Sequence, residues 1–340
     1  MSTKHRISLH LTGRTARELG DAAAQCEQAG VESIWASELY TNPYIPLAAA
    51  AGATERITLG TGIALAFVRS PLTIALAALD MDALCSGRFV LGLGTGVKHL
   101  NERWHGVRDF GPPVRHMREV VGFLRVFLAK AHTGESMSFD GQFVRAEIRG
   151  YRRPYPPVRE RIPIHLAANR EHMLRLAGEL ADGVLGHVFI SPKTVAEHVL
   201  PNVAIGLARA GRSRSEITIG AGITCAIDPD RATARRHAAG PLAFYATVRT
   251  YEPLFARDGF AAECARIRAA GEAGERETLV ELVTDEMIDC YCAAGTPDEV
   301  RAAVSRWDGL LDVKGISPPR HFCPPDAHAT YRERILELFA

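Results

Sequence analysis

The residues that could do chemistry in this chain stand where predicted strands end, and most are glycines or short polar residues. In chain order these strand ends are Thr12-Gly13, Glu38-Leu39-Tyr40, Gly62-Ile63, Gly94-Thr95-Gly96, Ala168-Asn169-Arg170 and Gly186-His187. Glu38 and His187 are the candidate proton carriers among them. Glycine lacks the Cβ that would hold a ligand away from the backbone, so the set favours a site for a large, flat ligand.

Other kinds of chemistry are disfavoured by the same residues. The chain has no pair of acids at glycosidase spacing and no Gly-x-Ser-x-Gly nucleophile elbow. The run Gly92-Leu-Gly94-Thr-Gly96 departs from the Gly-x-Gly-x-x-Gly dinucleotide fingerprint, and it belongs to the fourth strand rather than the first. His99, Glu102 and His105 have no matching cluster elsewhere, so we expect no metal site.

Buried strands alternate with helices through most of the chain, and this alternation decides where the strand ends lie. We expect Thr15 to cap a helix over residues 16–29, and Pro71 to open one over residues 71–84. Apolar strands separated by helices indicate a parallel sheet covered on both faces. The eight predicted strands are residues 6–11, 33–37, 57–63, 88–93, 162–167, 183–189, 217–226 and 310–317. Eight such strands predict an α/β fold, the (β/α)8 TIM barrel, whose chemistry lies at the carboxyl ends of the strands.

Two insertions distinguish the chain from a minimal barrel, and we predict one domain over residues 1–340. The first, after the fourth strand (approximately 97–161), contains a polar loop over 97–115, a helix over 113–129 and a hairpin around Asp140-Gly141. The second lies in the C-terminal third, at approximately 250–295, and holds more helix than one barrel repeat needs. Aromatic residues in or near the first favour an apolar or aromatic substrate, although packing beneath a long loop explains them equally well.

The composition of the chain limits which binding partners and which cellular compartment can be expected. The 340 residues include 40 Lys+Arg and 39 Asp+Glu, a formal net charge of +1, so nothing draws the whole chain to nucleic acid or to an acidic membrane. The seven cysteines contain no Cys-x-x-Cys, which indicates free thiols. The N-terminus lacks the apolar stretch of a signal peptide, and no apolar run is long enough to span a bilayer. We therefore predict a cytoplasmic protein that acts on a small organic molecule.

Three sequence strings, in order, resemble the bacterial luciferase-like monooxygenase superfamily. They are Ala53-Thr-Glu-Arg-Ile-Thr-Leu-Gly-Thr-Gly62, Arg69-Ser-Pro71 and Ser86-Gly-Arg-Phe-Val-Leu-Gly-Leu-Gly-Thr-Gly96. Weaker matches continue through Ala177-Gly-Glu-Leu-Ala-Asp-Gly183, so that the resemblance covers roughly residues 6–225. Within the superfamily the chain is more similar to the branch that uses the deazaflavin coenzyme F420 than to the luciferases.

The resemblance implies a TIM barrel with a flavin or deazaflavin at its carboxyl-terminal mouth. It implies a bulge at Gly62-Ile63, often with a non-prolyl cis bond, against the back of the cofactor ring. The cofactor contacts that it implies are Gly62, Ile63, Thr95, Gly96, Ala167, Ala168, Asn169, Gly183 and Gly186. Thr12 and Glu38 are added to them as candidates at strand ends. Arg69 and Arg88 are expected to tie loops to the ends of the barrel instead.

Leu39 marks a departure from the F420-using branch, where many relatives have histidine after the acidic residue. Val97 likewise stands where some sugar-phosphate dehydrogenases of the branch carry a glutamate. We therefore favour Glu38 as the proton carrier and His187 as the second candidate. The leading hypothesis is an F420-dependent oxidoreductase that transfers a hydride between the deazaflavin C5 and an organic substrate, as a homodimer.

Two other hypotheses remain open. An FMN-dependent monooxygenase of the same family would activate oxygen with a partner flavin reductase. A non-catalytic member that has lost cofactor binding is the third, and Leu39 is the feature that supports it. If F420 is the cofactor, its polyanionic tail requires the 35 arginines to be unevenly placed, because the sum of charges shows no basic excess.

Overall fold

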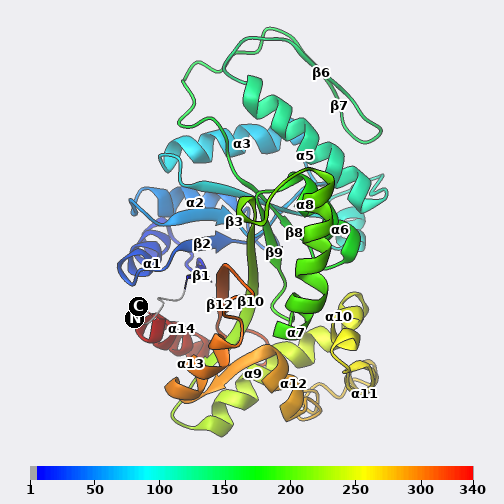
Figure 1. Cartoon of the computed structure of the whole chain (residues 1–340). Helices are drawn as coiled ribbons and strands as arrows, with labels where there is room; N and C mark the ends of the chain where they lie inside the picture. Colours follow the sequence, from blue (N-terminus) through cyan, green and yellow to red (C-terminus); the bar gives the residue numbers. More distant parts are fainter. Residues whose placement is uncertain (1–5, 340) are drawn as a thin grey trace. The chain divides into compact units, whose positions relative to one another are not determined.

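The computed structural model describes residues 6–339, which form two compact units (Figure 1). The first unit comprises residues 6–9, 186–201 and 219–339, and the second comprises residues 10–185 and 202–218. Residues 1–5, on which the prediction about the N-terminus depends in part, lie outside the described residues. All eight predicted strands are present, and they are divided between the two units.

The second unit has five neighbouring parallel strands. Their order is β2 (Ser33–Ala36), β3 (Thr58–Thr61), β5 (Phe89–Gly94), β8 (Ile164–Ala167) and β9 (Gly183–Gly186). The short β4 (Ala64–Leu65) pairs with the end of β5. Every residue of β2 and β5 is buried, which explains why these strands show no polar alternation in the sequence.

Helices of the second unit follow the strands and lie on the outside of them (Figure 1). They include α1 (Ala16–Gln28), α2 (Tyr44–Ala51), α3 (Pro71–Leu84), α5 (Pro113–Lys130), α6 (Glu171–Leu180) and most of α8 (Leu200–Arg209). The predicted cap is confirmed: Thr15 and Glu18 form a capping box that satisfies backbone N–H groups at the start of α1. Pro71 occupies the first turn of α3, where its missing N–H costs no hydrogen bond.

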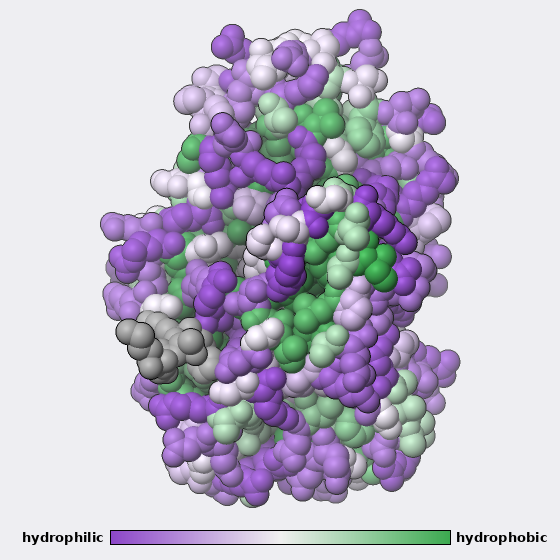
Figure 2. Space-filling view, in the orientation of Figure 1, coloured by the Kyte–Doolittle hydropathy of each residue, from purple (hydrophilic) through white to green (hydrophobic). Residues whose placement is uncertain are grey.

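The first insertion differs from its prediction in two places. Helix α4 (Lys98–Trp104) lies within the predicted polar loop. The hairpin of β6 (Met137–Asp140) and β7 (Arg145–Ile148) is present, but its loop has four residues rather than a tight Asp-Gly turn. The reason is tertiary: the Glu119 carboxylate on α5 accepts the backbone N–H groups of Phe143 and Val144 and so shapes the loop. The hairpin projects beyond α5, and its visible face is mostly hydrophilic (Figures 1 and 2).

The first unit contains the remaining strands, in the order β11 (Cys292–Gly295), β10 (Thr218–Ile227), β12 (Val313–Ser317) and β1 (Ile7–His10). β11 lies beyond the eight predicted strands and extends the sheet at β10. The helices of this unit are α7 (Pro192–Thr194), α9 (Arg231–Ala246), α10 (Glu252–Arg257), α11 (Ala261–Glu272), α12 (Asp285–Tyr291), α13 (Pro297–Ser305) and α14 (Pro325–Phe339). Short π and 3-10 turns lie at 195–199 (η1), 214–216 (η2, in the second unit) and 249–251 (η3). Helices α10–α12 lie within the second predicted insertion, which is as rich in helix as the sequence predicts.

An apolar cluster fills the space between α9, α11 and α12 in the first unit, with Phe255, Ile267 and Tyr291 fully buried. All seven cysteines are free thiols, as predicted. Within residues 6–339, no helix is both long enough and apolar enough to cross a membrane.

Candidate active site at the strand ends

Strand β3 ends in a bulge that is bound to the end of β2. The Gly62-Ile63 peptide bond is cis, as the resemblance implies. Gly62 N–H donates to the Ala36 carbonyl at 2.8 Å, and Glu38 N–H donates to the Ile63 carbonyl at 3.0 Å. Gly62 and Ile63 are both half-buried, so the bulge presents backbone and an aliphatic side chain at its surface.

The Glu38 carboxylate is held by three donors. Its Oε2 accepts the Leu65 N–H at 2.7 Å and the Arg69 Nη1 at 2.9 Å, and its Oε1 is paired with Arg69 Nη2. The Glu38 and Arg69 side chains are 9% and 17% exposed. The prediction that Arg69 ties a loop to the end of the barrel is confirmed. A carboxylate bonded on both oxygens suits the support of the bulge better than it suits proton transfer.

The glycines of these strands make room for neighbouring side chains and backbone. A Cβ on Gly60 would lie 2.2 Å from the Trp35 ring, and one on Gly62 would lie 2.9 Å from the Trp35 Cβ. A Cβ on Gly94 would lie 2.0 Å from Ile63 Cδ1. The sequence interpretation, that these glycines bring backbone close to a ligand, is therefore incomplete, because protein atoms already fill the space beside them.

Thr95 and Gly96 lie directly after β5, and a residue missed from the sequence holds them there. Asn101 on α4 is fully buried, and its Nδ2 donates at 3.0 Å to the carbonyls of both Thr95 and Val97. Gly96 has φ +65°, a conformation that favours glycine. Because α4 falls within a stretch predicted as loop, no sequence signal distinguished Asn101 from an ordinary loop residue.

The end of β8 is adjacent to the end of β5 in the sheet. Ala167 and Asn169 are half-buried, whereas Ala168 is buried and donates its N–H to the Leu185 carbonyl at 3.3 Å. Gly183 lies elsewhere: it is the first residue of β9, opposite His165, and its Cβ position is 2.5 Å from the His165 ring. The second unit thus brings Gly62, Ile63, Thr95, Gly96 and the end of β8 to one edge of its sheet, and it places Gly183 away from that edge.

Thr12 is exposed and follows β1, and the preceding Leu11 N–H donates to the Trp35 carbonyl at 2.9 Å. Gly186 and His187 belong to the first unit. His187 packs against Phe189 and Tyr251, with ring centroids 5.2 and 4.7 Å away. Burial lowers the pKa of His187 to about 4, so the imidazole is neutral at pH 7.

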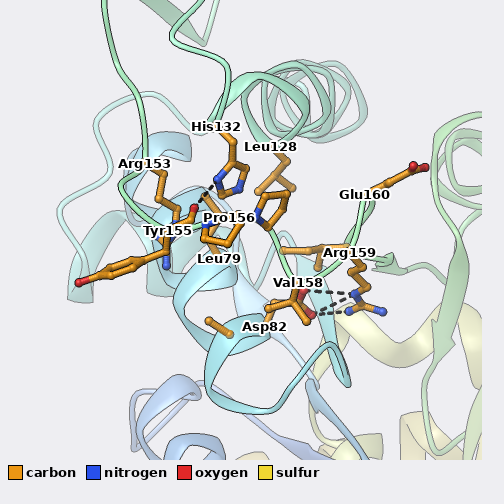
Figure 3. A pocket seen from close by; sticks show the side chains of 13 residues that line it. Leu79, Asp82, Leu128, His132, Arg153, Tyr155, Pro156, Val158, Arg159 and Glu160 are labelled. Atoms are coloured by element: carbon orange, nitrogen blue, oxygen red, sulfur yellow. Dashed lines mark hydrogen bonds and ion pairs between the residues drawn. The ribbon is translucent and has the colours of Figure 1, made fainter.

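A pocket in the second unit lies between α3, α5 and the loop that precedes β8 (Figure 3). Arg159 makes a bidentate ion pair with the buried Asp82 there, and its Nη2 also donates to the carbonyl of Phe89, the first residue of β5. The pocket is therefore at the amino end of β5, whereas Thr95 and Gly96 lie at the carboxyl end. It does not belong to the candidate active site.

Around the bulge, the strand-end surface of the second unit is lined by backbone, and the Glu38 carboxylate there is neutralised by Arg69. The Thr95 hydroxyl and the Asn169 amide lie at the ends of the neighbouring strands, where the exposed Arg170 follows Asn169. Among residues 6–339, no three His, Cys, Asp or Glu side chains come together as a metal site. Such a surface can hold the face of a planar ring and donate or accept hydrogen bonds at its edge.

The comparisons with known proteins identify the family. Residues 1–312 match the luciferase-like monooxygenase family. The 5,10-methylenetetrahydromethanopterin reductase of Archaeoglobus fulgidus is 32% identical over 303 residues, which cover 86% of this chain and 87% of the relative. The chain therefore belongs to the luciferase-like monooxygenase family, and it is an enzyme, an oxidoreductase.

Two solved structures show the fold. The F420-dependent tetrahydromethanopterin reductase of Methanopyrus kandleri has a TM-score of 0.80 and 24% identity, with 98% of this chain and 96% of that chain covered. The FMN-bound oxygenating component of a Pseudomonas putida diketocamphane monooxygenase has a TM-score of 0.71 and 19% identity, with 98% and 96% covered. The predicted (β/α)8 barrel is confirmed.

Proposed function

We propose that the chain is an F420-dependent oxidoreductase, in which a hydride passes between C5 of the deazaflavin and a carbon of an organic substrate. The observation that carries the proposal is the backbone-lined strand-end surface beside the neutralised Glu38–Arg69 pair. It is supported by a putative coenzyme F420-dependent oxidoreductase of Mycobacterium tuberculosis, a relative at 28% identity over 303 residues. Bound F420 would supply the hydride acceptor or donor, and the protein would supply binding, orientation and the exclusion of water.

The residues that would hold the cofactor are assigned from their places at the strand ends. Ile63 and Gly62 would support one face of the ring, and Thr95 and Gly96 would contact its edge. Residues that would contact the ring or tail more peripherally are Thr12, Ala167, Ala168, Asn169 and, in the first unit, Gly186. Gly183 would act indirectly, since it makes room for His165.

The accompanying proton is better assigned to His187 than to Glu38. Hydride transfer to or from a carbonyl or alcohol carbon requires one proton to be added to or removed from the substrate oxygen. Glu38 accepts hydrogen bonds on both oxygens. His187 is a neutral imidazole at pH 7, with one ring nitrogen that can accept, although the burial that keeps it neutral also makes it a weak base. In this proposal Glu38 is a positioning residue for the bulge.

The test is cofactor binding to the purified chain. We expect titration with F420 to quench the cofactor fluorescence with a sub-micromolar dissociation constant, and FMN to bind at least tenfold more weakly. Sub-micromolar FMN binding without F420 binding would contradict the proposal. It would instead support the second candidate, an FMN-dependent monooxygenase supplied by a flavin reductase, which the family description and the fold of the FMN-bound diketocamphane monooxygenase favour.

The proposal extends to the assembly and the compartment. We expect one barrel domain in a cytoplasmic homodimer, whose mass light scattering coupled to gel filtration would measure. A monomer at micromolar concentration would overturn the expectation about assembly without affecting the proposed chemistry.

A further inference from the structure

Five rings of the first unit form a continuous aromatic wall, and no step of the proposed function uses the whole of it. The wall consists of His187, Tyr245, Tyr251, Phe244 and His321. Tyr245 is its centre, with ring centroids 5.1 Å from His187, 4.8 Å from Tyr251, 5.1 Å from Phe244 and 5.6 Å from His321. Phe244 and His321 are stacked at 3.8 Å and 5°.

The wall is assembled from parts of the chain that are distant in sequence. His187 follows the carboxyl end of β9 by one residue, and His321 follows the carboxyl end of β12 by four. Tyr245 is in the last turn of α9, and Tyr251 is in the 3-10 turn η3 that follows. The active site of a (β/α)8 barrel is built from segments at the carboxyl ends of its strands. The rings of His187 and His321 therefore lie where substrate contacts are expected.

Buried aromatic residues hold the wall from behind. Tyr245 lies 4.9 Å from the ring of Phe189, which is itself stacked at 5.5 Å on Phe255. Phe189 and Phe255 are 1% and 0% exposed. His187, Tyr245, Tyr251 and His321 are instead half-buried, and Phe244 is 36% exposed. A wall with a rigid back and a partly exposed front is preorganised to receive a ligand ring.

The wall carries no charge at neutral pH. Burial lowers the pKa of His187 to about 4, and burial together with the nearby Arg320 lowers the pKa of His321. Burial raises the pKa of Tyr251 to about 12, so its phenol keeps its proton. Neutral imidazoles and phenols offer hydrogen-bond donors and acceptors to carbonyl, hydroxyl or ring-nitrogen groups, but the five rings themselves offer an anionic ligand no opposite charge. Arg320 adjoins the wall at its His321 end.

We propose that this wall binds the substrate, and that the substrate carries an uncharged planar aromatic or heteroaromatic ring. The ring would stack on Tyr251, with Tyr245, whose ring is perpendicular to that of Tyr251, at its edge and His187 beside its polar groups. The inference rests on the proposed function for the reaction, but the wall can be tested by binding alone.

The probe is 2-naphthol, which is planar and uncharged at pH 7, and 2-naphthoate is its anionic counterpart. We expect isothermal titration calorimetry to show that 2-naphthol binds the full chain at least tenfold more tightly than 2-naphthoate. Tyr245→Leu should weaken 2-naphthol binding at least tenfold, and so should Tyr251→Leu, whose half-buried position makes misfolding less of a concern. Tyr155→Leu is the matched control, because Tyr155 is a 68% exposed ring in the second unit, and it should leave binding unchanged.

F420 titrations of the same preparations separate the two proposals. If F420 binds and 2-naphthol does not, or if both wall variants bind 2-naphthol as the parent does, the wall proposal is overturned and the proposed function stands. If 2-naphthol binds in a manner that Tyr245→Leu and Tyr251→Leu weaken while F420 does not bind, the wall is supported and the F420 assignment fails. Circular dichroism of each variant confirms its fold before titration.

Discussion

At the scale of single residues, the structure changes the role of the acid that the sequence singles out. Glu38 follows β2, as predicted, but its contacts hold the bulge in place, and we call Glu38 and Arg69 together the clamp. The Glu38 backbone N–H binds the Ile63 carbonyl and its carboxylate binds the Leu65 N–H, so one residue holds both sides of the bulge. Arg69 neutralises the Glu38 carboxylate.

The clamp is tested by Glu38→Gln and Arg69→Met. Each should lower the free energy of unfolding by about 1–3 kcal/mol, because a hydrogen-bonded, largely buried charge pair loses one partner. Urea denaturation measures the loss, and the double variant should cost less than the sum of the two single variants. Glu102→Gln is the control, since Glu102 is exposed and 3.7 Å from Lys98. If Glu38→Gln left stability unchanged and abolished turnover alone, Glu38 would be a catalytic acid after all.

Two neutral imidazoles should make stability depend on pH. Burial lowers the pKa of both His165 and His187 to about 4, against about 6.5 in the unfolded chain. Between these values the unfolded state binds more protons, so the stabilisation is present above pH 6.5 and is lost as the pH falls towards 4. From pH 7 to pH 5 each imidazole should cost about 2 kcal/mol of unfolding free energy.

Urea denaturation at the two pH values measures this loss. His165→Asn should reduce the fall in stability between pH 7 and pH 5 by about 2 kcal/mol. The exposed His172 provides the control, and His172→Asn should leave the fall unchanged. An equal fall in the His165→Asn variant and the parent would show that His165 is protonated as readily in the folded state as in the unfolded chain.

At the scale of elements, glycine sets how closely α6 and α8 approach. A Cβ on Gly206 would lie 2.0 Å from the Arg175 carbonyl oxygen, and one on Gly178 would lie 2.3 Å from the Val203 carbonyl oxygen. Both clashes are with backbone, which cannot rotate away as a side chain can. Gly206→Ala should therefore lower the free energy of unfolding by about 1–3 kcal/mol despite the better helix propensity of alanine.

Thermal or urea denaturation measures this effect, with Gly52→Ala as the control. Gly52 ends α2 with φ −73°, and the nearest atom to its Cβ position is 3.9 Å away. Its replacement should change stability by less than about 0.5 kcal/mol. A Gly206→Ala variant as stable as the parent would mean that α6 and α8 can separate at little cost.

The sequence predicts elements well where the local signal and the tertiary structure agree. Capping at Thr15, proline at the start of α3 and uninterrupted apolar strands are local signals, and each is borne out. The hairpin loop and α4 were mispredicted, because Glu119 shapes the first from a distance and the buried Asn101 anchors the second. The aromatic wall was missed for the same reason, since its rings are brought together only by the fold.

At the scale of the whole molecule, the net charge of +1 does not show that some arginines are paired with acids and others are not. Many arginines are paired, as Arg159 is with Asp82 and Arg125 with Asp182. Arg103 and Arg170 are exposed, and no ion pair joins either to another of the described residues. Arg170 directly follows Asn169 at the end of β8, and Arg103 is in the last turn of α4, the helix that comes after β5, the parallel neighbour of β8.

These two arginines should attract the anionic tail of F420. Arg170→Gln should weaken F420 binding about three- to tenfold at 50 mM salt, the effect of one exposed charge pair, and the difference from the parent should shrink at 500 mM salt because of screening. Fluorescence titration at both salt concentrations measures the change in F420 affinity.

A deazaflavin without the phosphate and glutamyl tail should bind the parent and Arg170→Gln equally well. Arg276→Gln, at an exposed position of the first unit, is the matched control. If Arg170→Gln weakened the tailless deazaflavin as much as F420, the arginine would contact the ring rather than the tail, and the proposed orientation of the cofactor would have to be reversed.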